Sequence, residues 1–131
     1  MAPSGQTDTQ TVLEDAGLDP DDLRDVALFE RLHPAIQGWW AHQFGDAARR
    51  SGGLFTAPQR AAIPAVADGA NVLVCAPTGA GKTLAAFTSI LDELARSAAA
   101  GALEEGVACV YISPLRSLAN DIDRNLQRPL D

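Results

Sequence analysis

Apolar residues recur at helical spacing in the first half of the chain and predict two helices there. The first is expected to begin near Asp19-Pro20-Asp21-Asp22, where carboxylates suit a helix N-terminus, and to end at Pro34. The second covers about 35–50 and is closed by the flexible sequence RRSGG at 49–53. The residues expected on their apolar faces are Leu23, Val26, Phe29 and Leu32 in the first helix, and Ile36, Trp39, Trp40 and Phe44 in the second.

The second half of the chain alternates between apolar runs and helical patterns. The runs VLVC at 72–75 and VACVYIS at 107–113 have no polar alternation, which is typical of strands in a parallel sheet covered on both faces. Helices are expected over 59–67, after 81 and after Pro114. Their apolar positions include Leu84, Phe87, Leu91 and Leu94, with Gly101 as a stop, and then Leu115, Leu118, Ile122 and Leu126. This order predicts an α/β fold with a right-handed crossover.

The sequence VLVCAPTGAGKT at 72–83 joins the first of these apolar runs to a helix through a loop of small residues. It matches a Walker A phosphate-binding loop, except that Ala76 stands where the general pattern has its first Gly. Small residues let backbone N–H groups turn toward a polyphosphate at the positive end of the helix. Lys82 is the only lysine of the chain, and its compact ammonium can reach β- and γ-phosphates. Thr83 is then a Mg²⁺ ligand, or else an ordinary threonine of an early helical turn.

Composition limits the class of protein that can contain this loop. The 131 residues amount to one domain at most, and a hydrophobic content of 47% excludes wholesale disorder. No run approaches a membrane span and the N-terminus lacks a signal core, so a cytoplasmic protein is expected. Cys75 and Cys109 lie in apolar runs, which favours buried reduced thiols. The net charge of −7 and the scarcity of lysine suit a salt-adapted protein and leave a local phosphate site possible, because salt screens distant charges.

Upstream of the loop, Gln59 lies 23 residues before Lys82 in FTAPQRAAIPAVADGANVLVC. A glutamine amide can match the acceptor and donor on the edge of adenine, although a lone glutamine is more often a surface residue. With Pro58 before it, the segment resembles the Q-motif of superfamily 2 helicases, and SPLRSLAND at 113–121 resembles their motif Ia. FERLHPAIQGWW and NDIDRNLQRPL narrow the resemblance, over roughly 27–131, to large helicase-related (Lhr-type) ATP-dependent helicases in a haloarchaeal-looking version.

The resemblance implies a truncated RecA-like domain over 54–131, after a weakly ordered tail at 1–18 and a helical segment at 19–53. It implies ATP and Mg²⁺ as cofactors and a DNA or RNA strand as partner. Gln59 would read adenine, and an aromatic residue would stack on it, with Trp40, Phe44 and Phe55 as candidates. The residues that would hold the phosphates and Mg²⁺ are Thr78, Gly79, Ala80, Gly81, Lys82 and Thr83. Pro114 and Arg116 would lie under the nucleic-acid backbone; the family usually has Lys at Arg116, and Arg keeps the charge.

Two features of such helicases are absent from the sequence: the Asp-Glu-x-His box that supports ATP hydrolysis and the second RecA-like domain. DELA at 92–95 is the nearest string, but it lies inside a predicted helix and is interpreted as solvated helix surface. The chain is therefore expected to be the N-terminal part of a longer helicase or translocase, inactive by itself. The alternative is a catalytically inactive nucleotide- or partner-binding module. A kinase is disfavoured, because neither Gln59 nor SPLRSLAND belongs to one.

Overall fold

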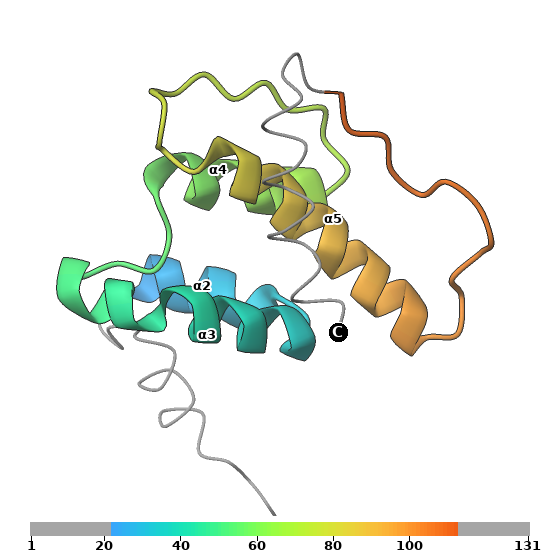
Figure 1. The fold of residues 1–131 in the computed structure, drawn as a ribbon, viewed down its shortest axis with the longest axis horizontal. Helices are drawn as coiled ribbons and strands as arrows, with labels where there is room; N and C mark the ends of the chain where they lie inside the picture. Colours follow the sequence, from blue (N-terminus) through green and yellow to red (C-terminus); the bar gives the residue numbers. More distant parts are fainter. Residues whose placement is uncertain (1–21, 113–131) are drawn as a thin grey trace, which may run out of the picture.

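The computed structural model describes residues 22–112, and this part of the chain contains four helices (Figure 1). The helices are α2 (Leu23–Arg31), α3 (Pro34–Ser51), α4 (Ala57–Ala67) and α5 (Lys82–Ala99). All four were expected from the sequence, and α2, α3 and α5 from the periodicity of apolar residues. None of the helices in the described range is both long enough and apolar enough to cross a membrane.

The ends of α2 and α3 follow from local side-chain chemistry. Asp22 is the N-cap of α2, where its carboxylate accepts a hydrogen bond of 3.2 Å from the Arg24 N–H. The hydrogen bond and charge of Arg24 lower the pKa of the Asp22 carboxyl. Pro34 begins α3 rather than only ending α2, because a proline at the first helical position loses no hydrogen bond. Gly52, with φ +77°, ends α3 in the left-handed conformation.

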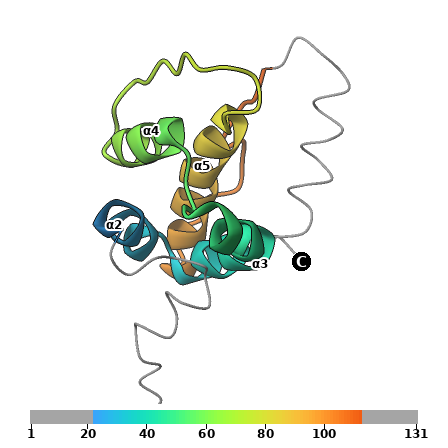
Figure 2. The same cartoon turned by 90° about the vertical axis from the view of Figure 1, so that its left-hand side faces the viewer.

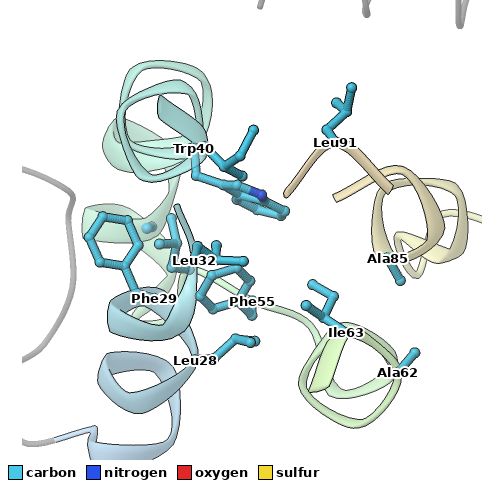
Figure 3. Close-up of a cluster of buried hydrophobic side chains, with 12 residues drawn as sticks. Leu28, Phe29, Leu32, Trp40, Phe55, Ala62, Ile63, Ala85 and Leu91 are labelled. Atoms are coloured by element: carbon cyan, nitrogen blue, oxygen red, sulfur yellow. The ribbon is translucent and has the colours of Figure 1, made fainter. Parts of the chain in front are cut away.

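The hydrophobic core lies where the N-terminal helix pair meets α4 and α5 (Figure 3). Trp40 on α3 is 1% exposed and points into this space, where its Nε1 donates a hydrogen bond of 3.1 Å to Thr88 Oγ1 on α5. The interpretation of the aromatic residues as core is therefore confirmed for Trp40. The buried apolar residues are Leu28, Phe29, Leu32, Ile36, Trp40, Ala48, Leu54, Phe55, Ala62, Ile63, Ala85 and Leu91.

The predicted face of α2 was wrong at its first position. Leu23 is 74% exposed, whereas Leu28 is buried beside Phe29 and Leu32. The buried stripe begins with a polar residue, Asp25, which lies on the face toward α4 and the segment before it. A pattern search for apolar residues passes over that aspartate and therefore starts the stripe two positions too early, at Leu23.

Helix α5 runs alongside α4 and also reaches α3 (Figures 1 and 2). One consequence corrects the interpretation of 92–95 as solvated surface. Asp92 is 8% exposed, and its carboxylate accepts hydrogen bonds of 2.5 Å from the His33 N–H and 2.7 Å from Arg96 Nε. It ties the corner between α2 and α3 to α5, because the unpaired backbone N–H at a helix start needs an acceptor. Glu93, next to it, is exposed as expected.

The predicted strands are not formed in the described residues, which are helical or irregular. The segment 70–78 bows away from the helices, and the segment after α5 returns as an open coil (Figure 1). Leu73 and Ile112 are almost fully exposed, and a groove of about 600 Å³ separates α5 from 102–109. An apolar strand needs partner strands and cover on both faces, and the two segments do not pair with each other here.

Burial of the two cysteines was also predicted wrongly. Cys75 and Cys109 are exposed free thiols, because both belong to the segments that were expected to be covered by a sheet. The tail at 1–18, the helix after Pro114, and both Pro114 and Arg116 lie outside the described residues.

Candidate functional site

The loop 76–81 leads directly into the N-terminus of α5. Gly79 and Gly81 have φ of +83° and +80°, in the left-handed region that favours glycine, and Gly81 is the N-cap of the helix. The first turn of a helix has N–H groups without intrahelical acceptors and carries partial positive charge. The loop therefore presents backbone donors at the end of α5, as an anion site requires.

The side chains that follow the loop are placed for polar chemistry. The Lys82 ammonium donates hydrogen bonds to two loop carbonyls, at 2.5 Å to Ala76 O and 3.1 Å to Pro77 O. Thr78 and Thr83 are exposed, so both hydroxyls are open to solvent. The sole lysine of the chain thus lies over the loop, where it offsets the negative ends of the carbonyl groups.

Two residues at the start of α4, Thr56 and Gln59, hydrogen-bond to the loop, and we call this pair the brace. Thr56 Oγ1 donates a hydrogen bond of 2.7 Å to Ala80 O, and Gln59 Nε2 donates one of 3.2 Å to Gly81 O. The pair is itself fixed, because the Thr56 N–H donates to Gln59 Oε1 at 2.8 Å and the two residues form a capping box at the start of α4. The site therefore joins residues 56–59 to residues 80–81.

This brace leaves no space for a side chain at Gly81. A Cβ built there would lie 2.3 Å from Gln59 Nε2 and 3.4 Å from Thr56 Oγ1. At Gly79, by contrast, a Cβ would meet nothing within 4 Å. The two glycines share one backbone conformation, but only Gly81 is also in close contact with the neighbouring segment.

Gln59 is buried and is not a surface residue. It is 2% exposed, and its amide is already engaged by the Thr56 N–H and the Gly81 carbonyl. A glutamine amide has two N–H groups and a carbonyl with two lone pairs, so one donor and one acceptor position remain. In this conformation the hydrogen bonds of the Gln59 side chain hold the loop at Gly81 and the start of α4 at Thr56.

The three aromatic candidates for stacking on adenine are all engaged in the core. Trp40 and Phe55 are 1% and 3% exposed, with ring centroids 4.7 Å apart. Phe44 is partly buried and packs against Trp40 at a centroid distance of 4.7 Å. All three rings pack in or against the hydrophobic core in the described structure.

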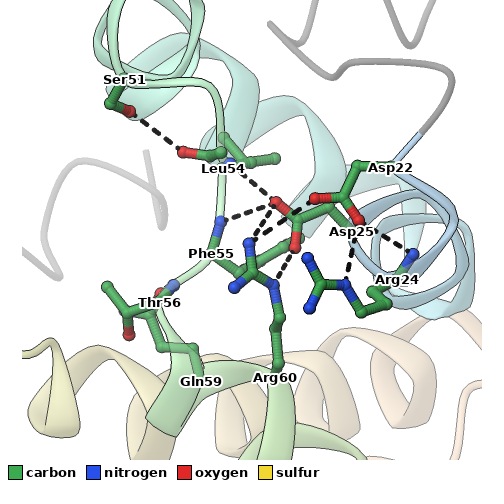
Figure 4. Close-up of polar contacts among 10 residues, drawn as sticks. Asp22, Arg24, Asp25, Ser51, Leu54, Phe55, Thr56, Gln59 and Arg60 are labelled. Atoms are coloured by element: carbon green, nitrogen blue, oxygen red, sulfur yellow. Dashed lines mark hydrogen bonds and ion pairs between the residues drawn. The ribbon is translucent and has the colours of Figure 1, made fainter.

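A buried carboxylate lies behind the brace (Figure 4). Asp25 of α2 is 1% exposed and accepts hydrogen bonds from the backbone N–H groups of Leu54 and Phe55, at 2.8 and 3.2 Å. Arg60 of α4 donates to the same carboxylate from Nε at 2.5 Å and from its terminal nitrogen at 3.3 Å. The hydrogen bond with Asp25 raises the pKa of the Arg60 guanidinium above its ordinary value.

The described residues contain no group of three or more His, Cys, Asp or Glu side chains that could hold a metal ion. The exposed Thr83 hydroxyl offers an oxygen ligand of the hard type that Mg²⁺ prefers.

Sequence reasoning missed Thr56, Asp25 and Arg60. Thr56 could have been found, because a threonine followed three residues later by glutamine is the signature of a capping box. Asp25 and Arg60 are 35 positions apart and carried no local signal.

Comparison with known protein families and relatives assigns the chain to a helicase family. Residues 56–131 match the DEAD/DEAH box helicase family. The chain is 53% identical over 106 residues to the ATP-dependent helicase Lhr-Core of Sulfolobus acidocaldarius, an alignment that covers 81% of this chain and 11% of that protein. It is 52% identical over 99 residues to Lhr-Core of Methanothermobacter thermautotrophicus, covering 76% of this chain and 11% of the relative. The chain thus spans about a ninth of the length of these relatives. No solved structure matches it.

Proposed function

We propose that this chain, which belongs to the DEAD/DEAH box helicase family, forms part of the ATP site of an ATP-dependent DNA or RNA helicase or translocase. The family implies a RecA-like fold and the use of ATP. The observation that carries the residue-level proposal is the brace, in which Thr56 and Gln59 hold Ala80 and Gly81 at the start of α5.

The proposed roles follow the geometry of the loop. Residues 78–81 offer backbone N–H groups to the phosphates, and Gly79 and Gly81 place no Cβ atom at two of these four positions. Lys82 leaves the carbonyls of Ala76 and Pro77 and neutralises β- and γ-phosphate charge. Thr83 is the protein ligand for Mg²⁺, which would neutralise the phosphates further. Gln59 uses its remaining donor and acceptor for adenine after a local opening.

Hydrolysis needs groups that these 131 residues do not contain. The sequence has no Asp-Glu-x-His box, so no carboxylate is assigned to the attacking water. We therefore propose nucleotide binding for this chain and assign turnover to the complete helicase. Pro114 and Arg116, beyond the described residues, are proposed to contact the phosphate backbone of the nucleic-acid strand without reading its bases.

The test is calorimetric titration of Mg²⁺-ATP into the 131-residue chain and its Lys82→Ala variant. We expect the variant to lose measurable binding, because it loses the only ammonium directed at the phosphates. Arg96→Ala is the matched control: it removes one cation from the far end of the same helix, where Arg96 pairs with Asp92. Equal ATP affinity in wild type and Lys82→Ala would reject the assigned site.

A further inference from the structure

The carboxylate of Asp25 joins α2 to a stretch of the chain that lies 29 to 35 positions later. It belongs to the first turn of α2, it accepts from two consecutive N–H groups of the segment before α4, and it pairs with Arg60 on α4 itself. We call Asp25, Leu54, Phe55 and Arg60 the Asp25 clamp. Figure 4 shows the four residues converging beside Thr56 and Gln59.

The surroundings of the clamp fit this arrangement closely. Arg60 has 25% of its side chain exposed and also lies 3.8 Å from an oxygen of Asp22. Gly53 gives its guanidinium room, because a Cβ there would lie 3.2 Å from the Arg60 terminal nitrogen and 3.7 Å from Asp25 Oδ2. The buried Asp25 carboxylate is thus paired with a guanidinium and with two backbone donors, as buried polar groups in proteins usually are.

The clamp is continuous with the brace of the phosphate loop. The Phe55 N–H donates to Asp25, and the next residue, Thr56, donates to Ala80 O. In the same way, Arg60 follows Gln59, which donates to Gly81 O. Phe55 and Arg60 are therefore direct neighbours of the two residues that contact the loop, and Leu54 lies one position before Phe55. Fixing 54, 55 and 60 fixes the backbone from which Thr56 and Gln59 reach residues 80 and 81.

We propose that Asp25 and Arg60 are positioning residues for the nucleotide loop, and that α2 thereby sets the affinity of a site that it does not contact in the described structure. This inference rests on the proposed function, that ATP binds at residues 78–83. When the clamp is broken, two N–H groups and one charge lose their partners, the segment 53–56 relaxes, and Thr56 and Gln59 no longer hold the loop carbonyls in place.

The experiment compares wild type with Asp25→Asn, which has the same shape but no charge. We expect ATP affinity to fall at least about fivefold, the lower end of typical coupling between two sites. Asp92→Asn is the matched control, since it removes a carboxylate that also accepts from a backbone N–H and an arginine, but near the middle of α5. It should leave ATP affinity unchanged. Equal losses in both variants would mean that general destabilisation is responsible, and the proposal would fail.

A double-mutant cycle tests the route through Thr56. In a Thr56→Val background the hydroxyl that contacts Ala80 is already gone, so Asp25→Asn should reduce ATP affinity by much less than in wild type. Full additivity of the two losses would overturn the proposed route. If Asp25→Asn does not fold, Arg60→Lys takes its place, because it keeps the charge and loses the forked geometry.

Amide hydrogen exchange separates this inference from the proposed function. Without nucleotide, Asp25→Asn should speed exchange at 54–56 and at 79–81, and Asp92→Asn should not. Faster exchange at 54–56 with an unchanged loop would refute the link to the loop, whether or not ATP binds. Failure of wild type to bind ATP would instead refute the proposed function.

Discussion

Gly81→Ala tests the contact between the loop proposed to bind phosphate and the segment that contains Thr56 and Gln59. The substitution adds one methyl group at a residue with φ +80°, where that group would lie 2.3 Å from Gln59 Nε2 and 3.1 Å from Gln59 Cδ. Gly79→Ala adds the same group at φ +83° with nothing within 4 Å. The pair of variants therefore has the same conformational cost and differs in the clash.

The expected sizes follow from these contacts. A non-glycine residue in the left-handed region costs roughly 1–2 kcal/mol, and this applies to both variants. In Gly81→Ala the Gln59 side chain must also move away. Helix α4 then loses the capping box that Gln59 forms with Thr56, which costs about 0.5–2 kcal/mol. Gly81→Ala should thus lower the free energy of unfolding by about 1.5–4 kcal/mol, and Gly79→Ala by about 1–2 kcal/mol.

Urea unfolding followed by tryptophan fluorescence measures both effects, because Trp39 and Trp40 are the only tryptophans and Trp40 is buried in the core. The decisive arm is Gly81→Ala in a Gln59→Ala background. Removing the glutamine amide removes the clash, so the added cost there should fall to that of Gly79→Ala. If Gly81→Ala lowers the free energy of unfolding equally with and without Gln59, the close contact does not contribute to stability.

Two further predictions concern ligands. Gln59→Ala should weaken ATP binding and reduce the preference for ATP over GTP by about 1–3 kcal/mol, measured by parallel titrations; an equal loss for both nucleotides would leave Gln59 as a brace that does not read the base. Arg116→Ala, in the complete helicase, should weaken binding to strands of every sequence and lower the salt slope of binding by roughly one, as measured by fluorescence anisotropy. A loss confined to particular sequences would contradict a backbone contact.

The helices could be predicted because their signals are local. The spacing of Leu84, Phe87 and Leu91 defines one face of α5, and that face is buried or partly buried in the structure. The glycines of RRSGG marked the end of α3, and the expected bounds of α3 and α4 lie within two residues of those observed. Local rules are sufficient where the chain satisfies its own backbone hydrogen bonds.

The errors occurred where a residue depends on distant partners. The segments 72–75 and 107–112 are apolar enough for strands, but a strand forms only when another strand supplies its hydrogen bonds. Asp92 was interpreted as surface because an aspartate in a helix usually is, yet the His33 N–H and Arg96 make its burial possible. Asp25 was missed for the same reason: its partners are 29 to 35 positions away.

The loop proposed to bind phosphate shows the same division between local and distant support. Its second half, residues 79–81, is fixed by Thr56, Gln59 and the start of α5 without any sheet. Its first half is held from Lys82, through the carbonyls of Ala76 and Pro77, and from the Ala80 N–H, which donates to Pro77 O at 3.2 Å. Phosphate binding would draw the ammonium away from those carbonyls, because a charged oxygen is the stronger acceptor. The first half of the loop would then need another support, and the apolar run at 72–75 that precedes it has the composition to obtain one by pairing in a sheet.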